Sequence, residues 1–359
     1  MDSFNKPRMI LKEGVNNNAF PAASVQVGSS EKIFWEESFG HLKPNNPKTS
    51  ITADTVYDLA SLTKVIATTT LLMRAVDEKL LFLETPVKQF FSEWRGADRE
   101  SVNIKDLLTH SSGLTSHMPF YVDCKGRLEF EHAICRLPLE YDPRDCSVYS
   151  DLGFILLAFI LEDLYMTGFD ELFLEVSQLF GWGDIRFRPP VSWKGRTAPT
   201  EFDAWRGRLL CGEVHDQNAS ALGGAAGHSG LFASVRAVGR FAQTLCSSFL
   251  GKSDLVSSST FSNFVTQAEP KKSSRALGWD TMLPTSSCGS SFSKRSIGHT
   301  GFTGTSLWID PEKDIYVALL TNRVHPSRTN EKLLTLRPRF HNAVLEVLSE
   351  LQNKTLGSF

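Results

Sequence analysis

Apolar residues gather in short runs near the two ends of the chain and in longer, helix-like stretches between them. Near the start, residues 22–28 and 32–40 are strand-like, and the tight Gly-Ser-Ser-Glu turn between them predicts a hairpin. Near the end, residues 307–310 and 315–322 are again strand-like, and an amphipathic helix is expected over residues 340–351. Strands are therefore expected at both ends of the chain.

The middle of the chain follows a helical period. After Ser61, apolar residues recur at steps of three and four up to Val76, and no glycine or proline interrupts them before Pro86. Residues 61–240 are predicted to be mostly helical, broken by loops around residues 180–200 that are rich in proline, glycine and tryptophan.

Together these patterns predict an α+β protein. Its antiparallel sheet would be completed by both chain ends, with helices flanking it and a mostly helical region inserted. We expect a single domain over residues 1–359, with an α/β part at about 1–80 and 240–359 and a helical part at about 81–239.

Composition narrows the possible partners and the compartment. The 359 residues, 41% of them hydrophobic, suffice for a large core, and a net charge of −2 gives no reason to expect nucleic acid or an anionic membrane as a partner. The six cysteines form no C-x-x-C pair, so a structural zinc is not expected. We interpret them as free thiols of a reducing compartment, and three disulfides are the alternative that their number allows. The oligomeric state stays open.

The first residues lack the pattern of a secretion signal. The apolar triplet Met9-Ile10-Leu11 ends at Lys12, which is too short for the apolar part of such a signal. The longest apolar run, residues 152–161, is half of what a bilayer span needs. We therefore expect a cytoplasmic protein.

Three motifs carry the candidate chemistry, in the order Ser61-Leu62-Thr63-Lys64, Tyr149-Ser150-Asp151 and His299-Thr300-Gly301. Ser-x-x-Lys alone is a weak signal, because the same spacing begins at three other serines of the chain, Ser3, Ser29 and Ser291. Only Ser61 begins a helix-like stretch, on which Lys64 would share its face, and the helix dipole would lower the pKa of both groups. By this motif alone, a surface pair on an ordinary amphipathic helix remains the alternative.

These motifs and their surroundings resemble the β-lactamase-like serine hydrolases, a superfamily that includes penicillin-binding proteins, class C β-lactamases and related esterases. The resemblance covers roughly residues 20–350. It is carried by the nucleophile segment at residues 56–64 and by a helix-to-loop segment at residues 104–114 that ends in Ser-Gly-Leu. It is also carried by the Tyr motif at residues 149–153 with the apolar helix after it, and by the His motif at residues 298–301 with the following strand at residues 307–310. It implies the β-lactamase/transpeptidase-like fold and an acyl-enzyme mechanism, for which we expect no cofactor.

Roles for the motif residues follow from this resemblance. Ser61 would attack the substrate carbonyl, and Lys64 and Tyr149 would form the proton relay, in an order that the sequence leaves open. The oxyanion would be held by the backbone N–H groups of Ser61 and Phe302. In the alternative interpretation, Tyr149 is a helix-capping core tyrosine and His299 a surface histidine at a strand end.

Two departures from the penicillin-recognising pattern affect the expected substrate. Asp151 stands where β-lactamases and D,D-peptidases usually carry Asn, and an ionised Asp can accept a hydrogen bond but not donate one. Its carboxylate would keep Lys64 charged and shift the role of base toward Tyr149. His299 stands where those enzymes usually carry Lys before Thr300-Gly301, which weakens the anchor for a substrate carboxylate, because a histidine of pKa about 6.5 is largely neutral at pH 7.

A glycine-rich polar stretch at residues 215–230 is a second candidate binding element. Glycines let the backbone approach a substrate closely, and a cell-wall-recycling amidase branch of the superfamily carries a similar stretch and a strand end similar to residues 321–326. His228 and Arg323 are therefore candidate substrate contacts, with a structural turn and a solvent-facing arginine as the alternative. A zinc ion bound by His215, Asp216 and His228 is disfavoured, because their spacing is not typical of a metal site.

Three functions stay open on the sequence. The favoured one is a serine hydrolase of the esterase or amidase type that cleaves small esters or peptidoglycan fragments. A D,D-peptidase or β-lactamase is the second, and the Asp151 and His299 departures disfavour it. A non-catalytic scaffold relative is the third, and the presence of Ser61, Lys64 and Tyr149 together argues against it.

Overall fold

The computed structural model describes residues 3–42, 49–268 and 273–356. The α-helices are α1 (Asn5–Asn16), α2 (Thr70–Asp77), α3 (Ile104–Leu108), α4 (Gly126–Arg136), α5 (Asp151–Tyr165), α6 (Phe169–Leu179), α7 (Gln217–Ala221), α8 (Val235–Phe249), α9 (Ser258–Val265) and α10 (Lys332–Leu356). The strands are β1 (Ala22–Gly28), β2 (Ile33–Gly40), β3 (Val56–Asp58), β4 (Ile185–Phe187), β5 (Phe202–Asp203), β6 (Arg208–Leu209), β7 (Leu231–Ser234), β8 (Asp280–Thr281), β9 (Ile297–Thr300), β10 (Ser306–Asp310) and β11 (Ile315–Thr321). Short 3₁₀ segments lie at Val87–Gln89, Phe120–Val122 and Val191–Arg196.

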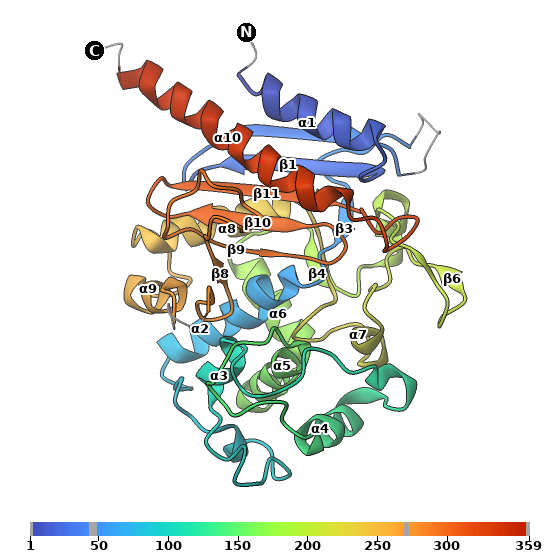
Figure 1. Ribbon diagram of the computed structural model, residues 1–359, viewed down its shortest axis with the longest axis vertical. Coiled ribbons are helices and arrows are strands. Elements are labelled where there is room, and N and C mark those ends of the chain that lie inside the picture. Colours follow the sequence, from blue (N-terminus) through green and yellow to red (C-terminus); the bar gives the residue numbers. More distant parts are fainter. Residues whose placement is uncertain (1–2, 43–48, 269–272, 357–359) are drawn as a thin grey trace.

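A six-stranded antiparallel sheet organises the molecule, in the order β2-β1-β11-β10-β9-β8 (Figure 1). In its centre β1 pairs with β11, so that Val25 lies opposite Leu319. The N-terminal and C-terminal segments therefore meet inside one sheet, which confirms the predicted α+β fold and its antiparallel sheet completed by both chain ends. The predicted strands agree with β1, β2, β10 and β11 to within about one residue.

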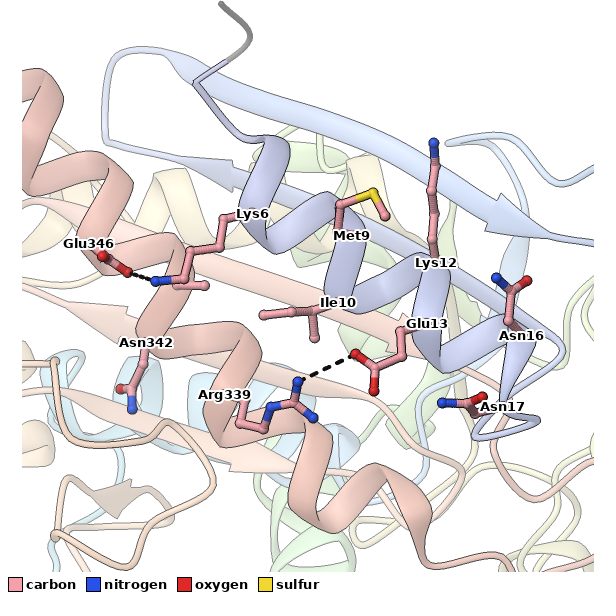
Figure 2. A pocket seen from close by; sticks show the side chains of 11 residues that line it. Lys6, Met9, Ile10, Lys12, Glu13, Asn16, Asn17, Arg339, Asn342 and Glu346 are labelled. Carbon is pink, nitrogen blue, oxygen red and sulfur yellow. Dashed lines mark hydrogen bonds and ion pairs between the residues drawn. The ribbon is translucent and has the colours of Figure 1, made fainter.

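Two helices from opposite ends of the chain cover one face of this sheet. Helices α1 and α10 lie side by side over it, and ion pairs join Lys6 to Glu346 and Arg339 to Glu13, the latter at 3.3 Å (Figure 2). Helix α1 was not expected from the sequence, and α10 begins eight residues before the predicted start. Pro338 interrupts the helical pattern in the sequence, but the helix continues through it, although proline supplies no backbone N–H there.

The larger core lies on the opposite face, between the sheet and the inserted region. Helix α8 packs directly on the sheet, and α2, α5 and α6 lie beyond it (Figure 1). The predicted helical insertion is present, but it is less helical than expected, since it also carries β4 to β7 and long loops. These strands have only two to four residues each, too few for an alternating pattern to be recognised in the sequence.

A small second sheet leads into the candidate site. Its order is β3-β7-β4, and the amide of Leu59 extends the β3 pairing by donating to the Leu231 carbonyl at 2.9 Å. The chain thus reaches Ser61 from a strand held on a fixed partner.

Two further expectations concern the cysteines and the membrane. All six cysteines are described, and no disulfide joins any of them, so the three-disulfide alternative does not hold in this structure. Among the described residues, no single helix has both the length and the apolar character needed to cross a bilayer; α5 and α6 reach them only as a pair, which is bent by 76°.

Gly298, directly before the third motif (His299-Thr300-Gly301), packs against Trp308, and a substitution at Gly298 tests this packing. A Cβ atom there would lie 2.2 Å from Cδ2 of Trp308, whose indole is buried. We expect Gly298→Ala to lower the free energy of unfolding by about 1–3 kcal/mol, the usual cost of overpacking a core. Urea denaturation measures this change. Gly195→Ala is the control, because no atom lies within 4 Å of the added Cβ; equal effects of the two substitutions would contradict the prediction.

Candidate active site

A strained turn directs Ser61 into the cleft. Strand β3 ends at Asp58, and Ala60 adopts a left-handed backbone conformation with φ of 46°. The Asp58 carboxylate stabilises this turn, because it accepts hydrogen bonds from the amides of Ala60 at 2.8 Å and His215 at 2.6 Å. Since a non-glycine residue rarely adopts this conformation, the strain marks the position before Ser61 as functionally constrained.

The helix predicted after Ser61 is present, with an unexpected beginning. Residues Lys64–Thr69 form a π-helical segment, and regular α-helix follows in α2. Such wider turns are rare and frequent at functional sites. The segment places the Lys64 side chain beneath Ser61 and not on the protein surface.

Lys64 is fully buried and connects three parts of the site. Its ammonium group donates to Oγ of Ser61 at 3.1 Å, to Oδ1 of Asp151 at 2.7 Å and to the carbonyl of His228 at 3.2 Å. The interpretation as a surface Ser-Lys pair is therefore wrong. Burial alone would lower the pKa of Lys64, but the Asp151 carboxylate and the Tyr149 phenol outweigh it, and the pKa rises above its usual value of 10.5.

Asp151 is the anion that keeps this lysine charged. It is the first residue of α5, where the positive end of the helix dipole also favours a carboxylate. Burial would raise the pKa of Asp151, but the Lys64 ammonium holds it far below its ordinary range. His117 Nδ1 lies 3.8 Å from the other carboxylate oxygen. Asp151 thus acts as a hydrogen-bond acceptor, as the sequence predicts.

Tyr149 lies between two histidine rings at the floor of the cleft. Its ring centroid is 4.7 Å from that of His110 and 5.8 Å from that of His299, and the Lys64 ammonium lies 4.8 Å from it. Arg275 approaches the same ring at 5.3 Å. Helix α5 is preceded by Ser150 at its N-cap, so Tyr149 is not a capping residue.

The hydrogen bonds of the two histidines define their protonation. His299 Nδ1 faces the Thr300 carbonyl at 2.8 Å and must donate, whereas His110 Nδ1 faces the Ser150 amide at 3.0 Å and must accept. Burial holds the pKa of both rings well below 6.5, so both are neutral. His299 is 4% exposed, which rules out a surface histidine.

A short loop after β9 brings a second backbone amide to the nucleophile. The hydroxyls of Thr303 and Thr305 donate to the carbonyls of Asp58 at 2.7 Å and Leu59 at 2.9 Å. Gly301 is required for this approach, because a Cβ there would lie 2.3 Å from the Leu59 carbonyl oxygen. In the described part of the chain, the amides of Ser61 and Phe302 donate to no acceptor, as expected of an oxyanion site before substrate binds.

The predicted site residues line one cleft of about 830 Å³. Lys64 lies buried beneath it, and the others form its wall: Ser61, Tyr149, Asp151, His228, His299, Thr300, Gly301, Phe302 and Arg323. Sequence reasoning missed His110 and Arg275, which contact Tyr149. His110 lies in a motif that the resemblance identified, whereas nothing in the serine-rich surroundings of Arg275 distinguishes it.

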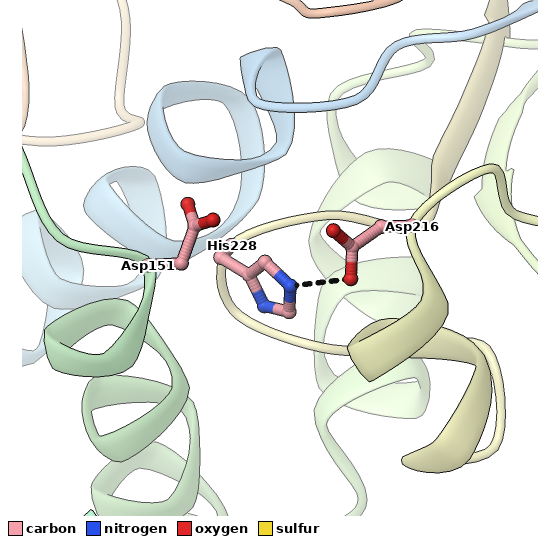
Figure 3. Close-up of side chains that lie close together, drawn as sticks. All are labelled: Asp151, Asp216 and His228. Carbon is pink, nitrogen blue, oxygen red and sulfur yellow. Dashed lines mark hydrogen bonds and ion pairs between the residues drawn. The ribbon is translucent and has the colours of Figure 1, made fainter. Parts of the chain in front are cut away.

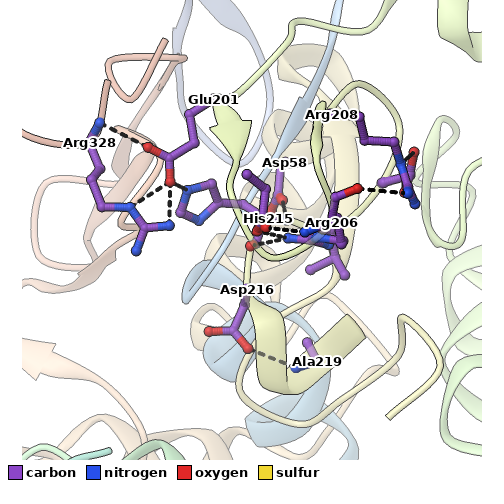
Figure 4. Close-up of polar contacts among 11 residues, drawn as sticks. Asp58, Glu201, Arg206, Arg208, His215, Asp216, Ala219 and Arg328 are labelled. Carbon is purple, nitrogen blue, oxygen red and sulfur yellow. Dashed lines mark hydrogen bonds and ion pairs between the residues drawn. The ribbon is translucent and has the colours of Figure 1, made fainter. Parts of the chain in front are cut away.

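The 215–230 stretch forms one wall of the cleft, and two hydrogen bonds between a histidine and a carboxylate hold it. His215 Nε2 lies 2.8 Å from Oε1 of Glu201, which also binds Arg328 (Figure 4). His228 Nε2 lies 2.8 Å from Oδ1 of Asp216. His228 and Arg323 are 1% and 8% exposed, so Arg323 is not the solvent-facing arginine of the alternative interpretation.

Potential metal ligands meet in a different combination from the one considered in the sequence. Among the described residues, Asp151, Asp216 and His228 bring ligand atoms within 4.8 Å of one another (Figure 3). His215 is instead held by Glu201. The Lys64 ammonium on Asp151 would repel a cation there, so this geometry does not favour a metal site.

Comparison with known proteins assigns the chain to a family. The sequence profile of the family described as Beta-lactamase matches residues 8–338, which is most of the chain. The chain belongs to the Beta-lactamase family. It is thus a β-lactamase-family serine hydrolase, which confirms the resemblance drawn from the motifs.

Related sequences of this family are named after one activity. A protein named "Putative D-alanyl-D-alanine carboxypeptidase" from Salmonella gallinarum is 29% identical over 358 residues, covering 88% of this chain and 81% of the relative. A protein of the same name from Escherichia coli K12 is 27% identical and covers 85% of this chain and 79% of the relative.

Solved structures confirm the β-lactamase/transpeptidase-like fold. EstCE1, a hydrolase with promiscuous acyltransferase activity, superposes with a TM-score of 0.75 at 17% identity, covering 94% of this chain and 98% of that one. A class C β-lactamase also gives a TM-score of 0.75 at 17% identity, covering 94% and 97%. At these identities the similarity concerns the fold.

The ion pair of Lys64 with Asp151 predicts a measurable charge state. Wild-type Lys64 should remain protonated through pH 10.5, because the carboxylate raises its pKa. Asp151→Asn removes the largest of the effects that raise this pKa, while burial and the Tyr149 phenol remain, so the pKa of Lys64 should fall below its wild-type value. Heteronuclear NMR of ¹³Cε-labelled lysine measures both values.

Asp163→Asn is the matched control, since that carboxylate pairs with Arg127 at the surface. It should leave the Lys64 signal unchanged. Deprotonation of Lys64 below pH 10.5 in the wild type would show that the assigned charge state is wrong.

Proposed function

We propose that this protein hydrolyses an ester or amide through an acyl-enzyme on Ser61. The observation that carries the proposal is the fully buried Lys64, which joins the Ser61 hydroxyl to the Asp151 carboxylate beneath the cleft. A scaffold has no physical need for such a charged group in its interior, where an ion pair costs desolvation energy.

In this mechanism Lys64 stays protonated and orients the Ser61 hydroxyl. Tyr149, acting in its phenolate form, takes the serine proton as Oγ bonds to the substrate carbonyl carbon, and it then passes that proton to the leaving group. Two cations, Lys64 and Arg275, flank the Tyr149 ring, which stabilises negative charge on its oxygen. Water then attacks the acyl-enzyme. Tyr149 takes a proton from this water and passes it to Oγ of Ser61 as the acyl group leaves.

The oxyanion formed in both steps would be held by the amides of Ser61 and Phe302. The loop that carries Phe302 is tied to the residues just before Ser61 by the Thr303 and Thr305 hydroxyls. Such preorganised donors cost no rearrangement when charge develops. His228, Thr300 and Arg323 are proposed as substrate contacts on the walls of the cleft.

For the substrate we propose small esters or peptidoglycan fragments, handled in the cytoplasm. A D,D-carboxypeptidase is the second candidate, and the names of the relatives from Salmonella gallinarum and Escherichia coli, which suggest peptide substrates, favour it. The neutral His299 and the acceptor-only Asp151 disfavour a penicillin-like substrate whose carboxylate and amide need a cation and a donor.

Labelling by a fluorophosphonate probe tests the nucleophile. Intact-mass spectrometry should detect one adduct on the wild type and none on Ser61→Ala, and the substitution should reduce p-nitrophenyl acetate hydrolysis by roughly a thousandfold or more. Ser291→Ala is the control, because Ser291 also begins a Ser-x-x-Lys sequence but is exposed. It should label like the wild type.

The same assay distinguishes the competing functions. A lasting benzylpenicillin adduct on Ser61 would favour the carboxypeptidase. An absence of adducts from both reagents on folded wild type would refute the acyl-enzyme mechanism and favour the scaffold.

A further inference from the structure

His110 holds the chain on both sides of Tyr149. Its backbone carbonyl accepts a hydrogen bond from the Val148 amide at 2.9 Å, and its side-chain Nδ1 accepts one from the Ser150 amide at 3.0 Å. His110 and Ser150 lie 40 positions apart in the sequence, so the contact depends on the tertiary fold. The neighbours of Tyr149 on either side are therefore tied to a single residue.

The backbone of His110 is shaped for this double contact. It has a left-handed conformation with φ of 56°, just after α3, and such a conformation is uncommon for a residue other than glycine. The His110 carbonyl also accepts a hydrogen bond from the Tyr141 hydroxyl at 3.0 Å, and the Tyr141 oxygen in turn accepts one from the Val148 amide at 3.3 Å. Backbone strain of this kind persists where the surrounding contacts hold it, and it is concentrated at functional sites. The strain at His110 thus coincides with the contacts that deliver Tyr149 to the cleft.

The His110 ring also packs directly on the Tyr149 ring, and their centroids are 4.7 Å apart. The ring of Phe154, near the start of α5, lies 5.1 Å from the His110 ring. At 1% exposure His110 has no solvent to turn into, and it does not itself line the cleft. It therefore limits both the position of the Tyr149 backbone and the direction of the Tyr149 side chain.

The hydrogen bonding of the ring explains why this buried residue is a histidine. With Nδ1 accepting, the ring proton is on Nε2, which is buried and has no acceptor among the described residues. An unmade hydrogen bond of a buried donor is costly, so a phenylalanine would pack here at lower cost if shape alone mattered. Burial and the nearby Arg275 and Lys64 cations hold the pKa of His110 well below 6.5, so Nδ1 stays free to accept. The acceptor for the Ser150 amide is therefore what distinguishes histidine from an apolar ring at this position.

We propose that His110 is a positioning residue, which sets the orientation of Tyr149 for proton transfer from Ser61. It acts through Tyr149 and not on the substrate. Misplacement of a reacting group by about 1 Å reduces a rate by about a hundredfold, so loss of the His110 acceptor should slow the attack of Ser61 more than it weakens binding. This inference rests on the acyl-enzyme function proposed above.

The rate of labelling by the fluorophosphonate probe, in which Oγ of Ser61 replaces fluoride on phosphorus, tests this role. Time courses at several probe concentrations give the inactivation rate constant and the dissociation constant of the probe separately. His110→Phe keeps an aromatic ring but removes the acceptor, so it should lower the inactivation rate constant by roughly a hundredfold. The dissociation constant of the probe should stay within about threefold of the wild-type value.

His110→Asn is the conservative variant. Its Oδ1 lies as many bonds from the backbone as Nδ1 of histidine, and asparagine adopts the left-handed conformation more readily than most residues. It should recover at least about tenfold of the rate that His110→Phe loses. His110→Gln places its acceptor one bond further out and should remain slow. Should His110→Phe fail to fold, the comparison of His110→Asn with His110→Gln decides.

His341→Phe is the matched control. His341 lies in α10, is fully buried, and has both ring nitrogens without a partner among the described residues. Its ring packs against Phe292 and Phe340, outside the cleft. The substitution replaces a buried histidine in the same way and should leave both labelling constants unchanged. Thermal melting of each variant selects a temperature at which all of them are folded.

Three results would overturn the positioning role: equal inactivation rate constants for His110→Phe and the wild type, an equal loss in His110→Asn and His110→Phe, or a weaker dissociation constant with an unchanged rate constant. Each of them leaves the labelling of wild-type Ser61, and so the hydrolase function, intact. No labelling of the folded wild type would instead refute the hydrolase function, and the role of His110 would fall with it.

Discussion

The ion pair between Lys64 and Asp151 is the interaction on which the site depends. It joins the segment after β3 to the start of α5, and through the His228 carbonyl it also holds the glycine-rich loop. A lysine that is completely removed from solvent needs this carboxylate, because burial alone would favour its neutral form. The same pair fixes a charge beside Tyr149 and a donor beside the Ser61 hydroxyl. One contact therefore sets both the geometry and the electrostatics of the cleft.

The sheet supplies the second constraint, since it brings distant segments to this pair. Its pairing of β1 with β11 joins the two ends of the chain, and β9 and β10 carry the 301–305 loop to the strand that precedes Ser61. Small residues make this approach possible: Gly301 leaves room for the Leu59 carbonyl, and Gly298 for the Trp308 indole. The position of the Phe302 amide thus follows from packing at several places in the sheet.

The parts of the site that the sequence predicted are those with local signals. Ser61 and Lys64 share a helix, so their proximity follows from helical geometry, and the strands at both ends were recognisable from apolar runs. The π-helical turn, α1 and the short strands β4 to β7 were not predicted. The short strands contain too few residues for a period, and the wider turn depends on the buried partners of Lys64 and not on its sequence neighbours.

The sequence by itself determined the family, the three motifs and the replacement of Asn and Lys by Asp151 and His299. Only the tertiary structure decided that Lys64 and His299 are buried and that His110 and Arg275 contact Tyr149. The physical reason is that charge and protonation depend on burial and on neighbours from distant segments. A sequence records residue types and local periods, whereas the solvent exposure of a lysine, histidine or arginine is set by the elements that pack around it.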